Sequence, residues 1–377
     1  MLSIRRPSPR FATRSAFVVA GFISACWSPL IPFAKTRLDV NDAQLGLLLL
    51  TFGVGSLLGV SVAGLFATRI GARPIVLAAG LGLCVFLPAL SVAASPVTLG
   101  STLFLFGASL GALDVAMNAH GVEVEKAAGV PLMSGFHALF SLGGFAGAAL
   151  MTLSLRSHVS VLAATIVASL SAACLIATAA TGLLKARPPD PRIALFVLPS
   201  GLVVVIAVLA ATMFLAEGAV FDWSGLLIVD LGVTSRANAG VGFILFSIAM
   251  TVGRISGDLV VRRLGGRRVL QWGGGLAILG LALVLTRPFA PLAVGGFLLV
   301  GLGAANVVPV LFSAAGRQTS MPPTLAVAAV TSTAYAGVLA GPPVLGFVAH
   351  AVGLPAAFWL LTGLLLLVPL LARTATE

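Results

Sequence analysis

The stretch LLKARPPDPRIA, from Leu183 to Ala194, is the most charged and proline-rich part of this 377-residue chain and lies near its midpoint. The chain around it is strongly apolar, with 59% hydrophobic and only 9% charged residues. Soluble domains carry roughly 25% charged residues, so the expected solvent is a lipid bilayer. The stretch therefore predicts a cytoplasmic loop, residues 184–193, between an N-terminal bundle, residues 1–183, and a C-terminal bundle, residues 194–377.

Outward from this loop, twelve apolar stretches are each long enough to cross a membrane, which takes about 20 helical residues. The predicted spans are residues 15–35, 43–67, 74–94, 97–121, 131–153, 159–181, 194–220, 238–261, 268–287, 291–314, 323–347 and 354–372. The chain is thus predicted to be an all-α membrane protein with twelve transmembrane helices in two six-helix pseudo-repeats.

The basic residues indicate the orientation and exclude nucleic acid as a partner. The net charge is +11, but Lys and Arg lie in short gaps between apolar stretches, not on one face or arm. With the N-terminus in the cytoplasm, sixteen of the 22 Lys and Arg face that side, as the positive-inside rule expects. We therefore expect a multi-pass protein of a plasma membrane, the bacterial inner membrane, with both termini cytoplasmic. The three scattered cysteines predict neither a metal site nor disulfides, and we expect no cofactor.

Three short motifs recur in the same order on both sides of the central loop, which indicates an internal repeat. RIGARP (residues 69–74) returns as RLGGRR (263–268), GALDV (111–115) as GAANV (303–307), and SGFHALFSLGG (134–144) as STAYAGVLAGP (332–342). Two parallel six-helix repeats are expected to hold a substrate near the membrane midplane. The loop residues expected to act in gating are Arg69, Gly71, Arg73, Arg263, Gly265 and Arg267.

With these features the chain resembles the major facilitator superfamily of transporters over essentially its whole length. The superfamily's loop signature is G-x-x-x-D-R-x-G-R-R, and GLFATRIGAR, residues 64–73, follows it with Thr68 replacing the acid and Ala72 a base. More narrowly, GALDVAMNAHGVEVE, AEGAVFDWS and GRISGD are similar to a bacterial branch related to fucose permease. The resemblance implies the major facilitator fold and a monomer in the lipid bilayer. It also implies a small-molecule substrate, which the related permeases import together with protons.

Polar residues inside the spans are candidates for proton and solute binding, because a charge at the bilayer centre costs about 2.5–3.5 kcal/mol. Asp114 and Asn118, four residues apart, are predicted to share a helix face, and Asn306 is the repeat counterpart of Asp114. Asp114 is interpreted either as a group that carries a proton or touches solute, or as a permanent hydrogen-bond partner between spans 4 and 5. His137 is either a second proton carrier or an interhelical histidine, and Tyr335 is its repeat counterpart.

The seventh span ends in AEGAVFDWS, which places Glu217 outward of the span's middle and Asp222 and Trp223 near the outer mouth. Carboxylates and an aromatic ring suit a sugar or polyol, through hydrogen bonds to hydroxyls and contact with a CH face. Trp223 is equally consistent with an interfacial anchor. Trp27 in the first span either lines the cavity or packs in the core, and His120 is expected at the cytoplasmic interface.

Arg254 and Asp258, one turn apart in the eighth span, can form an ion pair on one helix face, which we interpret as gating structure. An enzyme is not expected. The GASLG match to G-x-S-x-G, residues 107–111, lies inside an apolar stretch and not at a strand-to-helix turn.

The predicted function is secondary active transport of a small polar solute by alternating access, with a proton moving in symport. The rival is proton-coupled efflux of drugs or metabolites. Such exporters usually carry an Arg in span 4, where this chain has Gly107, and G-x-x-x-G-P in span 5, which this chain has in span 11. A third possibility is a membrane sensor that binds a solute without moving it.

Overall fold

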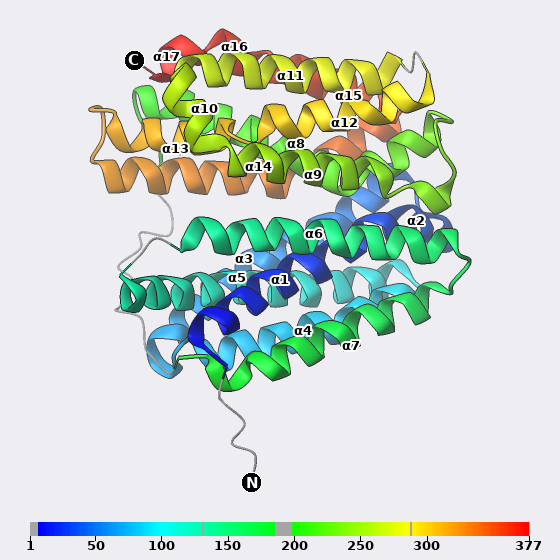
Figure 1. Ribbon diagram of the computed structural model, residues 1–377. Coiled ribbons are helices and arrows are strands. Elements are labelled where there is room, and N and C mark those ends of the chain that lie inside the picture. The colour runs from blue at the N-terminus through cyan, green and yellow to red at the C-terminus, as the bar shows by residue number, and fades with distance from the viewer. Residues whose placement is uncertain (1–6, 130–131, 185–197, 287–288, 377) are drawn as a thin grey trace. The chain divides into compact units, whose positions relative to one another are not determined.

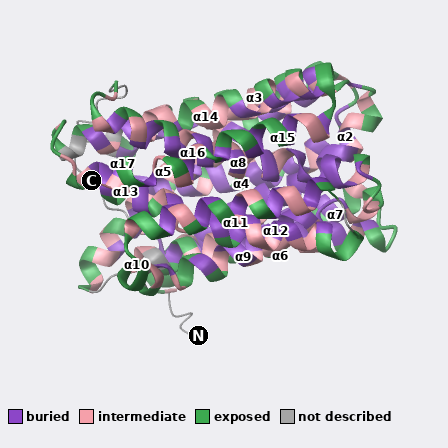
Figure 2. Ribbon diagram, turned by 90° about the horizontal axis from the view of Figure 1, so that it is seen from above, coloured by how far each residue is buried: buried purple, intermediate pink, exposed green. Residues whose placement is uncertain are grey.

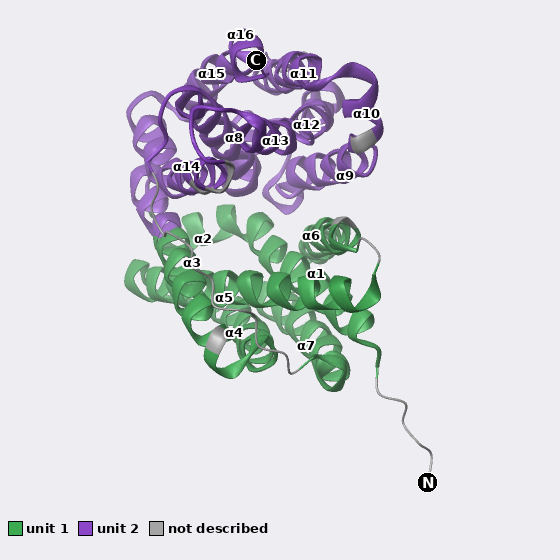
Figure 3. Cartoon of the chain, turned by 90° about the vertical axis from the view of Figure 1, so that its left-hand side faces the viewer, with its two compact units in different colours: residues 1–40, 51–192 green, residues 41–50, 193–377 purple. Residues whose placement is uncertain are grey.

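A computed structural model gives the fold over residues 7–129, 132–184, 198–286 and 289–376, without some side chains, those of Thr68 and Asp258 among them. Helices are the only regular elements in these residues (Figure 1), which confirms the predicted all-α fold. The chain divides into two compact units (Figure 3). The first comprises residues 1–40 and 51–192, and the second residues 41–50 and 193–377.

The first unit is built on long apolar helices around a buried α1. Its helices are α1 (Pro9–Trp27), α2 (Ile31–Leu38), most of α3 (Asp42–Ile70), α4 (Ala72–Val92), α5 (Pro96–Ala128), α6 (Met133–Arg156) and α7 (Val161–Ala179). α1 packs against α6, α7 and α5, and α4 packs against α5 and α7. Pro29 and Pro32 follow α1 closely, and a short 3₁₀ turn, Ser28–Leu30, joins it to α2 because proline cannot continue the α-helical hydrogen bonding.

The second unit is arranged around α8, whose buried residues run along its whole length (Figure 2). Its helices are α8 (Leu202–Asp230), α9 (Val241–Ile255), α10 (Gly257–Leu264), α11 (Gly266–Thr286), α12 (Ala290–Ala304), α13 (Val307–Arg317), α14 (Pro323–Val352), α15 (Leu354–Leu365), α16 (Leu367–Leu370) and α17 (Ala372–Thr376). α8 packs against α14, α13 and α9, and α12 packs against both α9 and α11. Residues 41–50, at the start of α3, complete the unit, where Gly46 lies against Pro342 and Gly346 of α14.

Eleven helices in the described residues are long and apolar enough to cross a membrane, one fewer than predicted. The twelfth predicted span, residues 354–372, is divided into the shorter helices α15 and α16, which cover Leu354–Leu370. Pro369 explains the division, because its ring clashes with the carbonyl of Leu365 and it has no N–H to donate. α15 accordingly ends at Leu365.

The seventh span is displaced from its predicted position at residues 194–220. α8 begins at Leu202, after Gly201 with φ 56°, and it continues to Asp230. The sequence pattern suggested an end near Asp222 because polar residues usually mark the end of a span. In the structure these residues lie inside the helix and do not mark its end, and their place at the outer mouth stays a prediction.

Two further predicted spans, both in the second unit, are each divided into two helices. The eighth, predicted as residues 238–261, breaks at Ser256, whose hydroxyl donates to the carbonyls of Val252 (3.0 Å) and Gly253 (3.2 Å). Such back-bonding competes with regular helical hydrogen bonds. The tenth breaks between α12 and α13, four residues before Pro309, and Asn306 stands at the N-cap position of the second helix without a capping hydrogen bond from its side chain.

Glycines let neighbouring helices approach to backbone contact. In the first unit, a Cβ added to Gly55 or Gly59 of α3 would meet the carbonyls of Phe104 and Ala108 on α5. The crossing is reciprocal, because a Cβ on Gly107 or Gly111 of α5 would meet the carbonyls of Phe52 and Ser56 on α3. The four-residue glycine spacing is therefore used here for close packing, as in other membrane helix pairs.

The two repeated loops share one backbone conformation. Gly71, before α4, has φ 82° and ψ 167°, and Gly265, before α11, has φ 75° and ψ 156°. Residues with a Cβ rarely adopt this region, which explains why the glycine of the R-x-G-x-R pattern occurs at the same place in both halves.

Candidate functional site

Asp114 lies within one helical turn of the midpoint of α5, deeper along its helix than the span boundaries predicted. Asn118 Nδ2 donates to the carboxylate Oδ1 of Asp114 at 3.1 Å and to its backbone carbonyl at 2.9 Å. The predicted shared face is therefore confirmed. In the described part of the chain, no side chain on a neighbouring helix hydrogen-bonds to this carboxylate, which gives no support to its interpretation as a fixed link between spans 4 and 5.

Glu217 lies within one turn of the midpoint of α8 and forms an ion pair with Arg254 of α9. The distance between Glu217 Oε2 and Arg254 Nη2 is 3.6 Å, and the two side chains are 19% and 42% exposed. The second carboxylate oxygen, Oε1, is buried and has no hydrogen-bond partner among the described residues. Glu217 thus has one oxygen directed to a cation and one oxygen without a partner.

This pairing corrects the expectation for Arg254. Arg254 and Asp258 do not lie on one uninterrupted helix, because α9 ends at Ile255 and Asp258 belongs to α10 beyond the break at Ser256. The cation is instead directed across to α8, where Glu217 lies. The side chain of Asp258 is outside the described residues, so its own role stays a prediction.

Asn306 joins the same region from the break between α12 and α13. Its Nδ2 donates to the carbonyl of Gly253 at 3.0 Å, and a Cβ on Gly257 would collide with its Oδ1. Because Gly253 directly precedes Arg254, a sequence of polar contacts runs from α8 through α9 to α12 and α13. We call Glu217, Arg254 and Asn306 the polar cluster of the second unit.

Several buried polar atoms on α8 and α1 have no hydrogen-bond partner among the described residues. They include Trp223 Nε1 and Ser224 Oγ on α8 and Trp27 Nε1 at the end of α1. Trp223 is 0% exposed and Trp27 2% exposed, so the interpretation of Trp223 as an interfacial anchor is wrong. Buried polar groups without partners are rare in folded proteins and are often found at functional sites.

The remaining cavity candidates are more accessible within their own units. Asp222 is half-buried, and at five residues from Glu217 it points to a different side of α8. His137 of α6 is exposed, and its ring contacts Phe17 edge-on at 5.1 Å between centroids. Tyr335 of α14 is 42% exposed. No contact in the described residues assigns these three to protons or solute, so their roles stay predictions.

His120 contacts the start of the predicted cytoplasmic loop, which agrees with its expected place near that end of the span, but its side chain is buried. It is 2% exposed and belongs to the buried residues of the first unit. Its Nε2 accepts the backbone N–H of Leu184 at 2.8 Å, and its Nδ1 lies 2.9 Å from Thr13 Oγ1. Because a backbone N–H can only donate, the proton of the neutral ring belongs on Nδ1. His120 therefore connects α1, α5 and the beginning of the central loop, which the sequence pattern could not indicate.

The loop residues are solvent-accessible and basic. Arg69, Arg263 and Arg267 are exposed and Arg73 is half-buried. Within the described residues, none of these arginines has an acidic partner. The acid expected in the first loop is replaced by Thr68, which agrees with this arrangement. Their role in gating stays a prediction.

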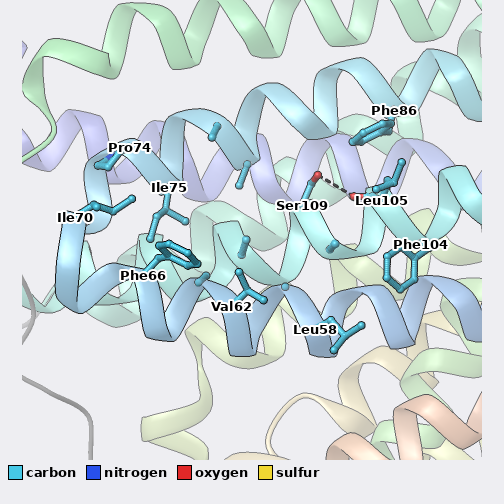
Figure 4. A pocket seen from close by; sticks show the side chains of 16 residues that line it. Leu58, Val62, Phe66, Ile70, Pro74, Ile75, Phe86, Phe104, Leu105 and Ser109 are labelled. Atoms are coloured by element: carbon cyan, nitrogen blue, oxygen red, sulfur yellow. Dashed lines mark hydrogen bonds between the residues drawn. The ribbon is translucent and has the colours of Figure 1, made fainter.

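An apolar cavity of about 680 Å³ lies between α3, α4 and α5 of the first unit (Figure 4). Phe66, Phe86 and Phe104 line it, and among the described residues its only polar side chain is Ser109, whose hydroxyl donates to the carbonyl of Leu105. A cavity without a charged or free polar group does not suit a polar solute. The buried polar residues are therefore better candidates for the solute site than this cavity.

The fold defines a multi-pass, all-helical membrane protein with carboxylates at the centres of two long helices. The model of the family described as Major Facilitator Superfamily matches residues 15–324, and the chain belongs to this superfamily. The chain is 44% identical over 98% of its length to an uncharacterised MFS-type transporter of Yersinia pestis, covering 96% of that protein. It is 31% identical to the membrane protein MosC of Rhizobium meliloti, over 90% of this chain and 83% of that one.

Solved structures share the fold at low sequence identity. A variant of the nucleoside transporter NupG superposes with a TM-score of 0.80 and 12% identity, covering 98% of this chain and all of that one. A D-xylose-proton symporter superposes with a TM-score of 0.71 and 15% identity, covering 96% of each chain. These structures confirm the predicted fold, and the family model and the relative from Yersinia pestis confirm the predicted family of transporters, not enzymes. The narrower relation to fucose permease stays a prediction.

Proposed function

We propose that this transporter moves a small polar solute, of the sugar or polyol type, together with a proton. The observation that carries the proposal is a carboxylate near the midpoint of a long membrane helix in each unit, Asp114 on α5 and Glu217 on α8. Charged groups at this depth are costly for insertion into a membrane, and they usually serve proton or solute binding. Alternating access between two helical repeats would expose such groups to each side in turn.

Asp114 is the better candidate for the proton carrier. Its one side-chain partner in the described residues, Asn118, is a neutral amide that can hydrogen-bond to either the ionised or the protonated carboxyl group. Glu217 is different, because protonating it would leave the guanidinium of Arg254 without its counter-charge. His137 remains a further candidate, since its side chain is exposed.

Glu217 is the better candidate for solute binding. Its Oε1 has no partner in the described residues and can accept a hydrogen bond from a solute hydroxyl. Ser224, whose hydroxyl is similarly without a partner, lies seven residues further along α8 and therefore on the same helix face, roughly 10 Å away. Acceptors and donors distributed along one face suit a solute that carries several hydroxyl groups.

The names of structural neighbours guide the choice of solutes to test. One neighbour is a nucleoside transporter and another a D-xylose-proton symporter. Both names favour polar solutes as the first compounds to test. The second name also favours a proton as the first coupling ion to test. The proposal includes a monomer in a bacterial inner membrane with both termini in the cytoplasm, as the distribution of basic residues predicts.

The test uses purified protein in liposomes that contain a pH-sensitive dye. Sugars, polyols, nucleosides and small metabolites are added outside, and the internal pH is followed. Symport predicts acidification with one solute class, abolished in Asp114→Asn. Glu123→Gln is the matched control, because Glu123 lies on the same helix but near its end, where it pairs with Lys126 at 3.3 Å.

Each outcome is informative. Solute-dependent alkalinisation would replace symport with antiport, the efflux alternative. Uptake of radiolabelled solute without any pH change, unaffected by Asp114→Asn, would refute proton coupling through Asp114. Glu217→Gln is expected to raise the solute concentration needed for half-maximal uptake. The substitution also leaves Arg254 without its ion-pair partner, which contributes to this effect. Solute binding without uptake of the solute and without a pH change would support the sensor alternative.

A further inference from the structure

A polar pocket of about 580 Å³ lies in the second unit, away from the polar cluster. Its lining residues are Leu264, Gly265, Gly266, Arg267, Arg268, Gln271, Arg317 and Thr376. They come from the end of α10, the first two turns of α11, the last residue of α13 and the end of α17. We call this site the arginine pocket, because three of its eight lining residues are arginines.

The three guanidinium groups are not neutralised by the residues that the structure describes. Arg267, Arg268 and Arg317 have no ion-pair partner there, and Gln271 has no side-chain hydrogen bond there. Arg267 and Arg268 also lie in the first turn of α11, the positive end of its helix dipole, where cations are unfavourable. Like charges gathered around one concave site repel one another unless an anion lies between them.

The backbone adds further donors to the arginine pocket. The first helical hydrogen bond of α11 runs from Val269 N–H to the carbonyl of Gly265, at 3.1 Å. The N–H groups of Gly266, Arg267 and Arg268 come before it, so no carbonyl of the helix can accept them. Gly265, with φ 75°, turns the chain so that α11 begins at this position. Exposed N–H groups at a helix N-terminus favour an anion, phosphate above all.

We propose that the arginine pocket binds a phosphate group. Guanidinium groups match phosphate oxygens with two parallel hydrogen bonds, and three such groups suit a dianion or a phosphodiester with its substituents. Gln271 and Thr376 provide neutral polar contacts at the edge. The phosphate belongs either to a soluble phosphorylated compound or to the headgroup of an anionic phospholipid, since this loop is expected at the cytoplasmic face. Bound phosphate would hold α11, α13 and α17 together.

The repeat-related loop of the first unit shares the backbone turn of the arginine pocket but borders a different kind of cavity. Gly71 has nearly the same backbone conformation as Gly265, and Arg73 occupies the first turn of α4. The cavity beside that loop is nevertheless apolar, with Ile70 and Pro74 among its lining residues (Figure 4).

The first experiment measures phosphate binding to the purified full chain in a non-ionic detergent. Inorganic phosphate is titrated against chloride at constant ionic strength, and the thermal unfolding midpoint is followed. We expect a saturable rise with phosphate, weakened about tenfold in Arg317→Gln or Arg268→Gln, as for loss of one charged hydrogen bond. Arg262→Gln is the matched control, because Arg262 is exposed on α10 and does not line the pocket.

A second arm identifies the source of the phosphate. The protein is mixed with vesicles of phosphatidylglycerol or of phosphatidylcholine, and retained lipid is counted by native mass spectrometry. Phosphatidylglycerol retained by the wild type and lost in Arg317→Gln assigns the site to a lipid headgroup, even without an effect of free phosphate. A phosphate effect without preferential phosphatidylglycerol retention assigns it to a soluble compound.

The proposal is overturned if the wild type shows neither a phosphate-specific midpoint shift nor preferential phosphatidylglycerol retention. It is also overturned if the arginine variants bind both ligands as well as Arg262→Gln does. Where an arginine variant does not fold, Gln271→Leu and Thr376→Val take its place, with a smaller expected loss of two- to threefold. These readouts measure binding and not transport, so they are independent of the proposed function.

Discussion

Replacing Gly107 of α5 with alanine is expected to destabilise the first unit, whereas the same replacement at Gly64 of α3 is expected to stabilise it. The added methyl group at position 107 would collide with the carbonyl oxygen of Phe52 on α3. At position 64 the structure has no heavy atom within 4 Å of the new Cβ. Both glycines are helical, so alanine changes the backbone free energy by a comparable amount at each position. The difference in stability between the two variants therefore measures only the close packing of α3 against α5.

The expected magnitudes follow from two opposing effects. Alanine is favoured over glycine inside a helix by about 0.8–1.0 kcal/mol, and at Gly64 nothing opposes this gain. Overpacking typically costs about 1–3 kcal/mol. The upper part of that range applies to Gly107, because parting α3 from α5 also loosens the contacts at Gly55, Gly59 and Gly111. The free energies of unfolding of the two variants should therefore differ by about 2–3 kcal/mol.

The assay is thermal unfolding of both variants and the wild type in one detergent, followed by the fluorescence of a thiol-reactive or environment-sensitive dye. The expected order of unfolding midpoints is Gly64→Ala, wild type, Gly107→Ala. Equal midpoints for the two variants, or a Gly107→Ala protein more stable than the wild type, would show that α3 and α5 do not cross at backbone contact. Gly107→Ser should behave like Gly107→Ala, since its Cβ occupies the same position.

Two further predictions concern buried polar contacts. A double-mutant cycle of Glu217→Gln and Arg254→Gln should give a coupling of about 1–3 kcal/mol in thermal stability, between the values of exposed and buried pairs, because Arg254 is 42% exposed. Coupling below about 0.5 kcal/mol would show that the pair is not stabilising. ¹⁵N NMR of histidine-labelled protein should find His120 neutral with its proton on Nδ1, as its contact with the Leu184 N–H requires. Thr13→Val should lower stability by about 1–3 kcal/mol, and an unchanged midpoint would contradict that contact.

The sequence predicted local features of the candidate site better than long-range ones. Asp114 and Asn118 are four residues apart, so helical geometry alone brings their side chains together. The pairing of Glu217 with Arg254 joins residues 37 positions apart in two helices, and no local rule selects it. Arg254 had an acid nearer in sequence, Asp258, but the break at Ser256 separates the two.

Depth in the membrane was predicted less well than the existence of the spans. The hydropathy pattern predicts an end of the seventh span near Asp222, because a polar residue normally signals the interface. α8 continues to Asp230, and Trp223 and Ser224 are both fully buried inside it. Polar side chains inside a bundle are compatible with a long helix when neighbouring helices shield them from lipid, and hydropathy alone cannot detect that shielding.

By itself, the sequence determined what depends on neighbouring residues. The apolar stretches are long enough for membrane helices, Pro369 divides the last of them, and Gly71 and Gly265 permit the same turn in both repeats. Only the tertiary structure decided which helix faces meet. Packing buried His120, directed Arg254 toward α8, and gathered three arginines around one pocket. Hydropathy, proline and glycine act over a few residues, whereas these contacts depend on how whole helices pack.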